Sequence, residues 1–211
     1  MAENNVNKTG TTTLGIVCKD GIVMGADKRV TAGNLIANKK YEKIALVADN
    51  VAITTAGLVS DAQLLTKVAR AEIKLKEVQM GRKITVKEAV NTLAGLSYSN
   101  IRYSGGIVGF LAGGYDQTTG FSLWDIGVDG SILQNDEYVT DGSGSVFVHG
   151  VMETLYAKDM SVQEGIALAV KSLDAAQKRD NASGSGFDII TITKDGIKKV
   201  ATKEYETKFQ I

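Results

Sequence analysis

The residues with the clearest potential for chemistry lie near the N-terminus, where Gly10 precedes three consecutive threonines. A threonine hydroxyl is a weak nucleophile that needs a base beside it. If the chain were cut between Gly10 and Thr11, the freed α-amine of Thr11, with a reference pKa of about 7.7–8.0, would supply that base. Gly10 has no side chain to obstruct the bend needed for Thr11 to attack the preceding carbonyl. Threonines before an apolar run also open ordinary strands, so these residues alone leave both interpretations open.

Five further polar residues stand near the ends of apolar segments: Asp27, Lys43, Ser143, Asp180 and Ser183. Taken one at a time, each has an ordinary structural interpretation. Asp27 suits a turn after a strand, Lys43 a solvated charge, and Ser143 a glycine-rich loop. Asp180 and Ser183 suit the turn that ends a helix. Their significance depends on whether the fold brings them together beside the threonines.

Other chemistries find little support in the sequence. It contains no phosphate-binding glycine pattern and no Cys-x-x-Cys pair. The single histidine, His149, has no second histidine or nearby cysteine, which argues against a metal site and against a Ser-His pair. The single cysteine, Cys18, lies in an apolar run and is expected to be a buried, inert thiol. We expect neither a metal nor an organic cofactor.

The composition is that of an ordinary globular protein, with 44% hydrophobic and 23% charged residues in a chain of 211. This length favours one domain. The 24 basic and 24 acidic residues balance, which gives no electrostatic case for a nucleic-acid or membrane partner. No apolar stretch is long enough to span a bilayer, and the polar residues 1–10 do not resemble a secretory signal. We expect a cytoplasmic protein.

The first half of the chain predicts strands and then helices. Alternating and β-branched residues predict strands over residues 11–18, 22–30, 43–48 and 51–55, with a weak one near 35–36. A capping box that begins at Ser60 predicts a helix that ends at Gly81. The expected buried face of this helix is the apolar stripe of Leu64, Val68, Ala71, Leu75 and Val78. A second capping box, at Thr85, predicts a helix that ends at Gly105.

The second half repeats this alternation. It predicts strands over residues 107–112, 120–126 and 131–139, then helices over 145–156 and 161–179, then strands over 188–193 and 196–201. Short turns between successive strands favour antiparallel pairing, and each pair of amphipathic helices needs a sheet face to cover. The predicted fold is therefore α+β, a four-layer α-β-β-α sandwich of two antiparallel sheets.

Six separated segments, in this order and at these spacings, resemble the β subunits of the 20S proteasome, and the short leader resembles the archaeal type. The segments are Gly10-Thr11, Gly25-Ala26-Asp27, Tyr41-Glu42-Lys43-Ile44, Ala56-Gly57, Gly142-Ser143-Gly144, and Arg179-Asp180-Asn181-Ala182-Ser183-Gly184. The resemblance covers nearly the whole chain. It implies the fold of N-terminal nucleophile hydrolases, which is the sandwich already expected from the pattern of elements.

The resemblance also implies a threonine-type endopeptidase, made as a zymogen that cleaves itself between Gly10 and Thr11. Thr11 would be the nucleophile and its free amine the proton acceptor. Lys43 would stabilise the developing alkoxide and lower the pKa of the amine, while Asp27 keeps Lys43 charged and oriented. Gly57 would offer its backbone N–H to the oxyanion.

Further residues are assigned by the same resemblance. Hydrogen bonds around the Thr11 amine would come from Ser143, Asp180 and Ser183. The positions that match those binding a substrate backbone as an added strand are Thr31, Gly57 and Val59. The pocket for the side chain before the cleaved bond would be formed by Val30, Ala45, Thr55 and Val59. None of these four is charged, so we expect a preference for apolar or neutral substrate residues there.

The implied assembly is a barrel of four seven-membered rings, with β subunits in the inner rings and α subunits in the outer ones. An unfolding ATPase would act through the α rings, and the substrates would be unfolded polypeptides. Exposed apolar stripes on the outer helices would form part of the ring contacts. Residues 1–10 would be a propeptide and residues 11–211 the catalytic domain. While the propeptide is attached, we expect an inactive state with residues 1–10 in or near the cleft, and Thr11 close to Lys43.

Three alternatives remain open. A non-catalytic subunit of the same ring would usually lack the threonine or the lysine, whereas Thr11 and Lys43 are both present. A simpler bacterial relative that works with an unfolding ATPase is shorter and starts its mature chain with Thr-Thr. An N-terminal nucleophile amidase acting on a small molecule would need a closed polar pocket, whereas Thr31, Gly57 and Val59 suggest an open peptide cleft.

Overall fold

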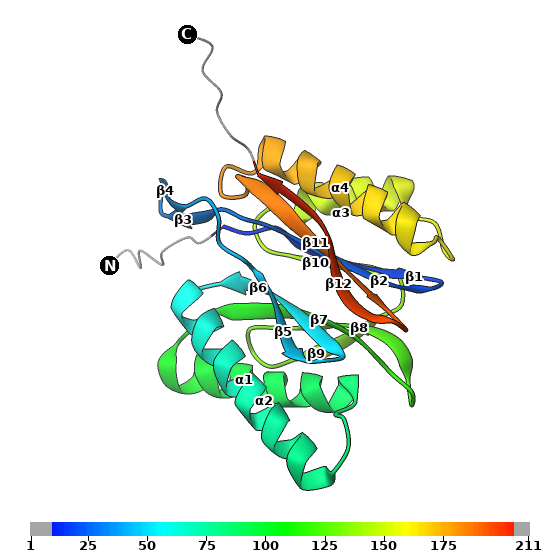
Figure 1. Ribbon diagram of the computed structural model, residues 1–211. Coiled ribbons are helices and arrows are strands. Elements are labelled where there is room, and N and C mark those ends of the chain that lie inside the picture. The colour runs from blue at the N-terminus through cyan, green and yellow to red at the C-terminus, as the bar shows by residue number, and fades with distance from the viewer. Residues whose placement is uncertain (1–9, 205–211) are drawn as a thin grey trace.

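Two antiparallel sheets lie face to face in the computed structural model, which describes residues 10–204 (Figure 1). The first sheet has the strand order β10-β1-β2-β11-β12, and the second has the order β5-β6-β7-β8-β9. The strands of the first sheet are β1 (Thr13–Cys18), β2 (Gly21–Asp27), β10 (Tyr138–Asp141), β11 (Gly186–Thr193) and β12 (Gly196–Glu204). Those of the second are β5 (Ile44–Ala48), β6 (Val51–Gly57), β7 (Val108–Asp116), β8 (Gly120–Ile126) and β9 (Ile132–Asn135).

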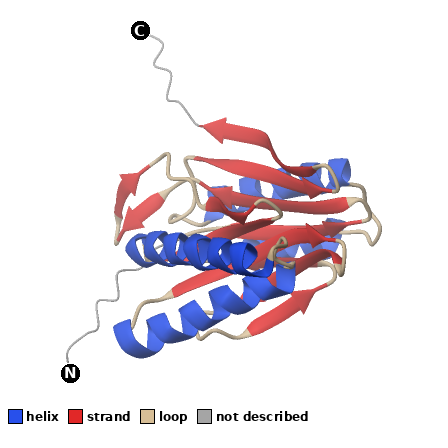
Figure 2. Cartoon of the chain, turned by 60° about the horizontal axis from the view of Figure 1, so that its bottom comes forward, coloured by secondary structure: helices blue, strands red, loops and turns tan. Residues whose placement is uncertain are grey.

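Helices cover the two outer faces. The pair α1 (Val59–Met80) and α2 (Val86–Ser104) packs on the second sheet, and the pair α3 (Ser145–Leu155) and α4 (Val162–Arg179) packs on the first. Figure 2, which brings the α1–α2 side forward, shows both helices in front of the strands that they cover. The four-layer α-β-β-α sandwich predicted from the order of elements is confirmed.

Strand β2 shows how the layers are held together. All seven of its residues are buried, because both faces of the strand are covered. Ile22 and Met24 join the apolar cluster between the two sheets, whereas Val23 points the other way, into the cluster under α3 and α4. On the second sheet, Leu111 faces the first sheet, while Phe110 packs under α1 and α2. The period-two alternation of strands thus builds three apolar layers.

Two predicted strands are divided in the structure. The predicted strand 22–30 ends at Asp27, and its last residue begins a short hairpin of β3 (Val30–Ala32) and β4 (Leu35–Asn38) that projects from the sandwich (Figure 1). The predicted strand 131–139 was wrong as a single element. Its first part, β9, pairs with β8 in the second sheet, and its last part, β10, pairs with β1 in the first. The chain changes sheets at this point, which periodicity within one segment does not reveal.

The prediction for α1 was wrong in two respects. The helix begins one residue before Ser60, after Leu58, and no side chain caps it. Ser60 instead donates a hydrogen bond to the neighbouring Asp61 carboxylate. The apolar stripe expected to be buried is largely exposed, with Leu64, Leu75 and Val78 accessible at 59%, 56% and 69%. The buried face is made by Ala62, Leu65, Thr66, Ala69 and Ile73, whose smaller members let the helix lie close to the sheet.

The other two predicted capping boxes, at Thr85 and Ser161, form in the structure. The Thr85 hydroxyl accepts a hydrogen bond from the backbone N–H of Glu88, and the Glu88 carboxylate accepts one from the backbone N–H of Thr85. Ser161 and Glu164 form the same reciprocal pair at the start of α4. Both boxes satisfy N–H groups that have no partner inside the helix. The two boxes therefore fix the residues at which α2 and α4 begin.

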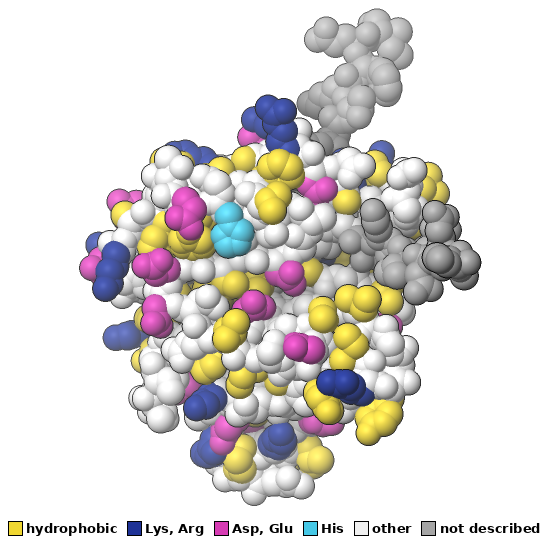
Figure 3. Space-filling view, turned by 180° about the vertical axis from the view of Figure 1, so that it is seen from behind, with side chains coloured by type: hydrophobic (Ala, Val, Ile, Leu, Met, Phe, Trp, Pro, Cys, Tyr) yellow, Lys and Arg dark blue, Asp and Glu magenta, His cyan; other side chains and the backbone are white. Residues whose placement is uncertain are grey.

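The surface carries charges of both signs. On the face opposite to that of Figure 1, acidic, basic and hydrophobic side chains are interspersed (Figure 3).

None of the helices within residues 10–204 combines the length and the apolar character that a membrane span requires.

Candidate active site

The pairing of β1 with β2 places Asp27 beside the threonines. In the register of this hairpin Thr13 faces Ala26, so the residues just beyond these, Thr12 and Asp27, also meet. The backbone N–H of Thr12 donates to Oδ1 of Asp27 at 2.9 Å, and the N–H of Asp27 donates to the carbonyl of Thr12 at 3.1 Å. The simple β-hairpin expected from the sequence is therefore what brings the carboxylate to the start of β1.

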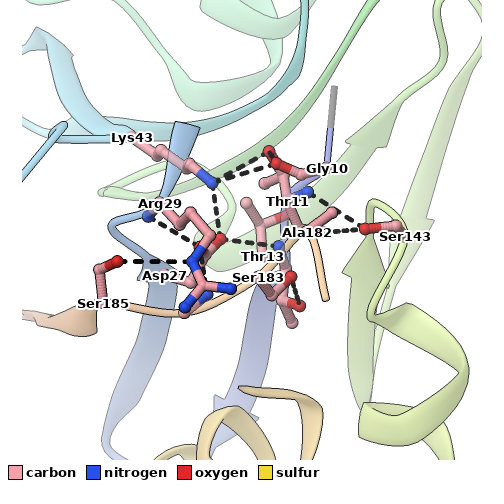
Figure 4. Close-up of polar contacts among 12 residues, drawn as sticks. Gly10, Thr11, Thr13, Asp27, Arg29, Lys43, Ser143, Ala182, Ser183 and Ser185 are labelled. Atoms are coloured by element: carbon pink, nitrogen blue, oxygen red, sulfur yellow. Dashed lines mark hydrogen bonds and ion pairs between the residues drawn. The ribbon is translucent and has the colours of Figure 1, made fainter. Parts of the chain in front are cut away.

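Lys43 reaches the same point from the second sheet. It directly precedes β5, and its carbonyl accepts a hydrogen bond from the backbone of Thr55 on β6. The side-chain Nζ lies 2.6 Å from Oδ1 of Asp27 and 3.1 Å from the hydroxyl of Thr11 (Figure 4). Thr11, Asp27 and Lys43 are all buried. The expectation that Thr11 lies close to Lys43 is met by direct contact.

Burial controls the charge of this cluster. It lowers the pKa of the Lys43 ammonium below its ordinary value, because the charged form loses its hydration. The Asp27 carboxylate opposes this effect by attracting the proton, while the guanidinium of Arg29 adds to it. Oδ2 of Asp27 also accepts hydrogen bonds from the backbone N–H groups of Arg29 and Gly184, each at 3.0 Å. With the bonds from Thr12 and Lys43, the Asp27 carboxylate thus accepts hydrogen bonds from four donors.

Ser143, Asp180 and Ser183 form a second chain of hydrogen bonds next to Thr11. The backbone nitrogen of Thr11 donates to Oγ of Ser143 at 3.3 Å, and that hydroxyl donates to Oδ2 of Asp180 at 2.5 Å. Ser183 donates to the same oxygen at 2.6 Å. Its hydroxyl also meets the hydroxyl of Thr12 at 2.7 Å. Only Ser143 therefore contacts the Thr11 nitrogen directly, and the other two residues act on it through Ser143 and Thr12.

The peptide bond before Thr11 lies in the centre of this arrangement. The Thr11 hydroxyl donates to the carbonyl oxygen of Gly10 at 2.7 Å, and Lys43 lies 3.5 Å from that oxygen. The N–H of Gly10 donates to the hydroxyl of Thr31 at 3.2 Å. Gly10 thus occupies the cleft, as expected for the residue before the cut. The expected position of residues 1–9 lies outside the described residues.

A small cavity opens beside Thr11 and Lys43. Five residues predicted to contact substrate line it: Val30, Thr31, Thr55, Gly57 and Val59. Ala45 does not line it, and its side chain packs against the apolar cluster under α1 and α2. Three lining residues were not anticipated: Arg29, Tyr41 and Ala62. Ala62 follows Val59 by one helical turn, and residues at this spacing share a helix face. Tyr41 stands two positions before Lys43. Both could therefore have been predicted from their spacing to residues already assigned to the site.

Gly57 is held in a conformation that suits only glycine. Its φ is +134°, and a Cβ at this position would lie 2.2 Å from the carbonyl oxygen of Ile107. The residue lines the cavity together with Thr11 and Lys43. Its backbone can therefore approach a bound ligand without a side chain in between.

Across residues 10–204, no three His, Cys, Asp or Glu side chains gather in a way that would hold a metal ion. The His149 side chain lies on the exposed side of α3. Cys18 is buried in the cluster beneath α3 and α4, where loss of hydration raises the pKa of its thiol to about 12. The prediction of a buried thiol is confirmed.

Comparison with known proteins gives the family. The family model described as a proteasome subunit matches residues 7–192. The chain belongs to the proteasome subunit family. Among curated relatives, "Proteasome subunit beta" of Archaeoglobus profundus is 42% identical over 93% of this chain and 91% of the relative. The protein of the same name from Archaeoglobus fulgidus is 41% identical over 98% and 95%, and that from Methanohalophilus mahii is 40% identical over 97% and 96%. These relatives are β subunits of archaea, which confirms the resemblance noted from the separated segments.

Proposed function

We propose that this chain is a self-processing, proteolytic β subunit that hydrolyses peptide bonds with Thr11 as its nucleophile. The observation that carries the proposal is the position of the Lys43 ammonium, 3.1 Å from the Thr11 hydroxyl and 2.6 Å from Asp27. A buried cation in that place stabilises negative charge as it develops on the hydroxyl oxygen. The family of the relatives, which are named proteasome β subunits, supports the same activity.

Processing would begin with the bond between Gly10 and Thr11. The Thr11 hydroxyl attacks the Gly10 carbonyl carbon, so that a C–O bond forms, the C–N bond breaks, and the hydroxyl proton passes to the nitrogen. Water then hydrolyses the resulting ester, which releases the carboxylate of Gly10 and leaves Thr11 with a free amine and hydroxyl. The contact of 2.7 Å between the hydroxyl and the Gly10 oxygen supports this step, because the two reacting groups are already adjacent.

In the processed chain, the Thr11 amine would act as the base for its own hydroxyl. The nitrogen lies beside Ser143, which connects it to Asp180, so this pair would orient the amine and stabilise it when it takes up a proton. The Asp27 carboxylate opposes the lowering of the Lys43 pKa by burial, and this would help Lys43 to stay charged. The N–H of Gly57 would donate to the oxyanion, where one such donor contributes about 3–4 kcal/mol to lowering the barrier.

The cavity would receive the substrate residue before the cleaved bond. Its predicted side-chain contacts, Val30, Thr55 and Val59, are uncharged, which supports a preference for apolar or neutral residues. The hydrogen bond from the Gly10 N–H to the Thr31 hydroxyl supports contact between a peptide backbone and this rim. A substrate would take the same position as an added strand.

The relatives' names support assembly into a proteasome core with other subunits. The finer expectations are seven-membered β rings enclosed by α rings, an unfolding ATPase, unfolded polypeptide substrates and a cytoplasmic location. The exposed apolar residues of α1, Leu64, Leu75 and Val78, support contacts with neighbouring subunits, because apolar groups on one helix face gain from being covered.

The experiment that tests the proposal is intact-mass measurement with N-terminal sequencing after the chain is assembled with its α partner. Wild type, Thr11→Ser and Thr11→Ala are compared. Loss of residues 1–10 in wild type, with peptide hydrolysis appearing in step, is expected. Thr11→Ser keeps a hydroxyl and should process more slowly, whereas Thr11→Ala should stay uncut and inactive. An uncut wild-type chain in a fully formed particle would favour the alternative, a structural subunit without catalytic activity.

A further inference from the structure

Arg29 lies two residues after Asp27, and its side chain turns toward a loop from the distant end of the chain (Figure 4). The guanidinium Nη1 donates to the carbonyl of Asn181 at 2.8 Å, and Nε lies 3.4 Å from the hydroxyl of Ser185. These contacts join the end of the β1–β2 hairpin to residues 181–185, which connect α4 to β11. The Arg29 side chain thus connects the hairpin that carries Asp27 to the loop that carries Ser183.

The loop is shaped around this guanidinium. A Cβ at Gly184 would lie 2.4 Å from Nη2 and 2.5 Å from Cζ of Arg29, so the planar group rests directly on the glycine backbone. Ser185 has a φ of +64°, which is uncommon for a residue with a side chain. Such a conformation persists where the surroundings hold it, and here the Ser185 hydroxyl faces Arg29.

The same loop carries three groups that meet the reacting residues. The N–H of Gly184 donates to Asp27, and the hydroxyl of Ser183 meets that of Thr12. Ala182 lies so close to Gly10 that a Cβ placed on Gly10 would fall 1.7 Å from the methyl carbon of Ala182. A shift of the loop would therefore move the carboxylate that holds Lys43 and change the packing beside the bond to be cut.

We propose that Arg29 is a positioning residue, whose guanidinium holds residues 181–185 in the conformation that aligns Asp27 and the threonine nucleophile. This inference rests on the proposed function of Thr11. Arginine suits the role because its planar fork can bond two acceptors at once and stack on a flat backbone. A lysine ammonium offers one point charge and no plane. The positive charge itself does not explain the residue, since it opposes the charge on nearby Lys43.

The test compares variants in particles assembled with the α partner, with kcat and KM measured on a short peptide. Arg29→Ala and Arg29→Lys should each lower kcat by about 10- to 100-fold while KM stays within about threefold, as expected when alignment rather than binding is lost. The matched control is Arg82→Ala, since Arg82 bonds Glu88 at the start of α2, far from this loop in the fold, and should leave both constants unchanged. Added guanidinium at low millimolar concentration should restore part of the Arg29→Ala activity, whereas equal sodium chloride or urea should not.

A second variant keeps the test decisive if Arg29→Ala fails to assemble. Ser185→Gly removes the hydroxyl that faces Arg29 but suits the positive φ, so the particle should form and show a fall in kcat of about threefold or more. Unchanged kcat in this variant and in Arg29→Lys would overturn the inference, and so would a raised KM at unchanged kcat, which would assign Arg29 to substrate binding. Thr11→Ala, measured alongside, separates the two claims: an active Thr11→Ala particle contradicts the proposed function, whereas an inactive one beside fully active Arg29 variants contradicts only the role of Arg29.

Discussion

The backbone of Gly10 lies against the methyl group of Ala182, so closely that a Cβ on residue 10 would fall 1.7 Å from the alanine Cβ. The residue before the proposed cleavage bond is thus fitted to a loop that arrives from the far end of the chain. Any larger residue at position 10 must displace either the loop or the bond itself.

Gly10→Ala should therefore slow self-cleavage by about 10- to 100-fold, because a displacement of about 1 Å misaligns the Thr11 hydroxyl and the carbonyl. Ala182→Gly removes the opposing methyl but leaves the Cα of residue 182 at 2.8 Å from such a Cβ, so the double variant should recover only part of the lost rate. An intact-mass time course after assembly measures both. Once processing is complete, Gly10→Ala particles should hydrolyse peptides at the wild-type rate, since residue 10 has left. A double variant no faster than Gly10→Ala would contradict this account of the contact.

Lys43 and Asp27 should differ in what their removal does to stability. Lys43→Met leaves Asp27 with three backbone N–H donors, from Thr12, Arg29 and Gly184, so the cost should be only about 1–2 kcal/mol. Asp27→Ala leaves those donors without an acceptor and the buried ammonium without its counter-ion, at a cost of about 3–5 kcal/mol. Peptide hydrolysis should fall by about 1000-fold or more in both. Urea unfolding of the unassembled chains checks the stabilities. Equal destabilisation by the two changes would show that the backbone donors do not hold the carboxylate.

The pair Arg82 and Glu88 should make the start of α2 sensitive to acid. The Arg82 guanidinium, together with hydrogen bonds from Thr85, lowers the pKa of Glu88 from 4.5 to about 2. Because the folded value is the lower one, this stabilisation is complete above pH 4.5 and is lost as the pH falls toward 2. Thermal unfolding between pH 5 and 2 should show a smaller acid-dependent loss in Glu88→Gln than in wild type. Parallel curves for the two proteins would contradict the assignment.

Cys18 should be unreactive in the folded chain. Burial raises the pKa of its thiol from 9.0 to about 12, which lowers the thiolate fraction near pH 8 by roughly 1000-fold. Iodoacetamide should therefore label Cys18 only after unfolding. A cysteine introduced at the exposed Leu133 should react within minutes in the same native sample and serves as the control. Rapid labelling of Cys18 itself in the native chain would show that its cluster opens readily.

The sequence predicted best what depends on few neighbouring residues. The capping boxes at Thr85 and Ser161 each involve four consecutive residues, and both form. The start of α1 instead follows a tertiary contact, the hydrogen bond from Leu58 to Ile107, which no local pattern contains. The prediction of the buried face of α1 was wrong because packing on the sheet, and not the local pattern, decides which face is covered. Two apolar stripes compete there, and the one with small residues, such as Ala62 and Ala69, is the one that packs on the sheet.

In the candidate site, too, the residues that the sequence missed are those whose role depends on distant contacts. Thr11, Asp27 and Lys43 were predicted because their segments resemble those of a known family, and the structure brings all three together. Arg29 was missed, since its contacts are to a loop more than 150 positions away, and nothing in its own segment points there. Ala45 was placed in the pocket by resemblance alone, but its side chain packs into the apolar layer instead.

The most direct test of the central claim compares two assembled particles built from chains that start at Thr11, one with a free amine and one Nα-acetylated. The measurement is the rate of hydrolysis of a short peptide. If the Thr11 amine is the base for its own hydroxyl, the free chain hydrolyses the peptide, and the acetylated chain is slower by about 100-fold or more. Equal rates in the two particles would show that the Thr11 amine takes no part in the reaction.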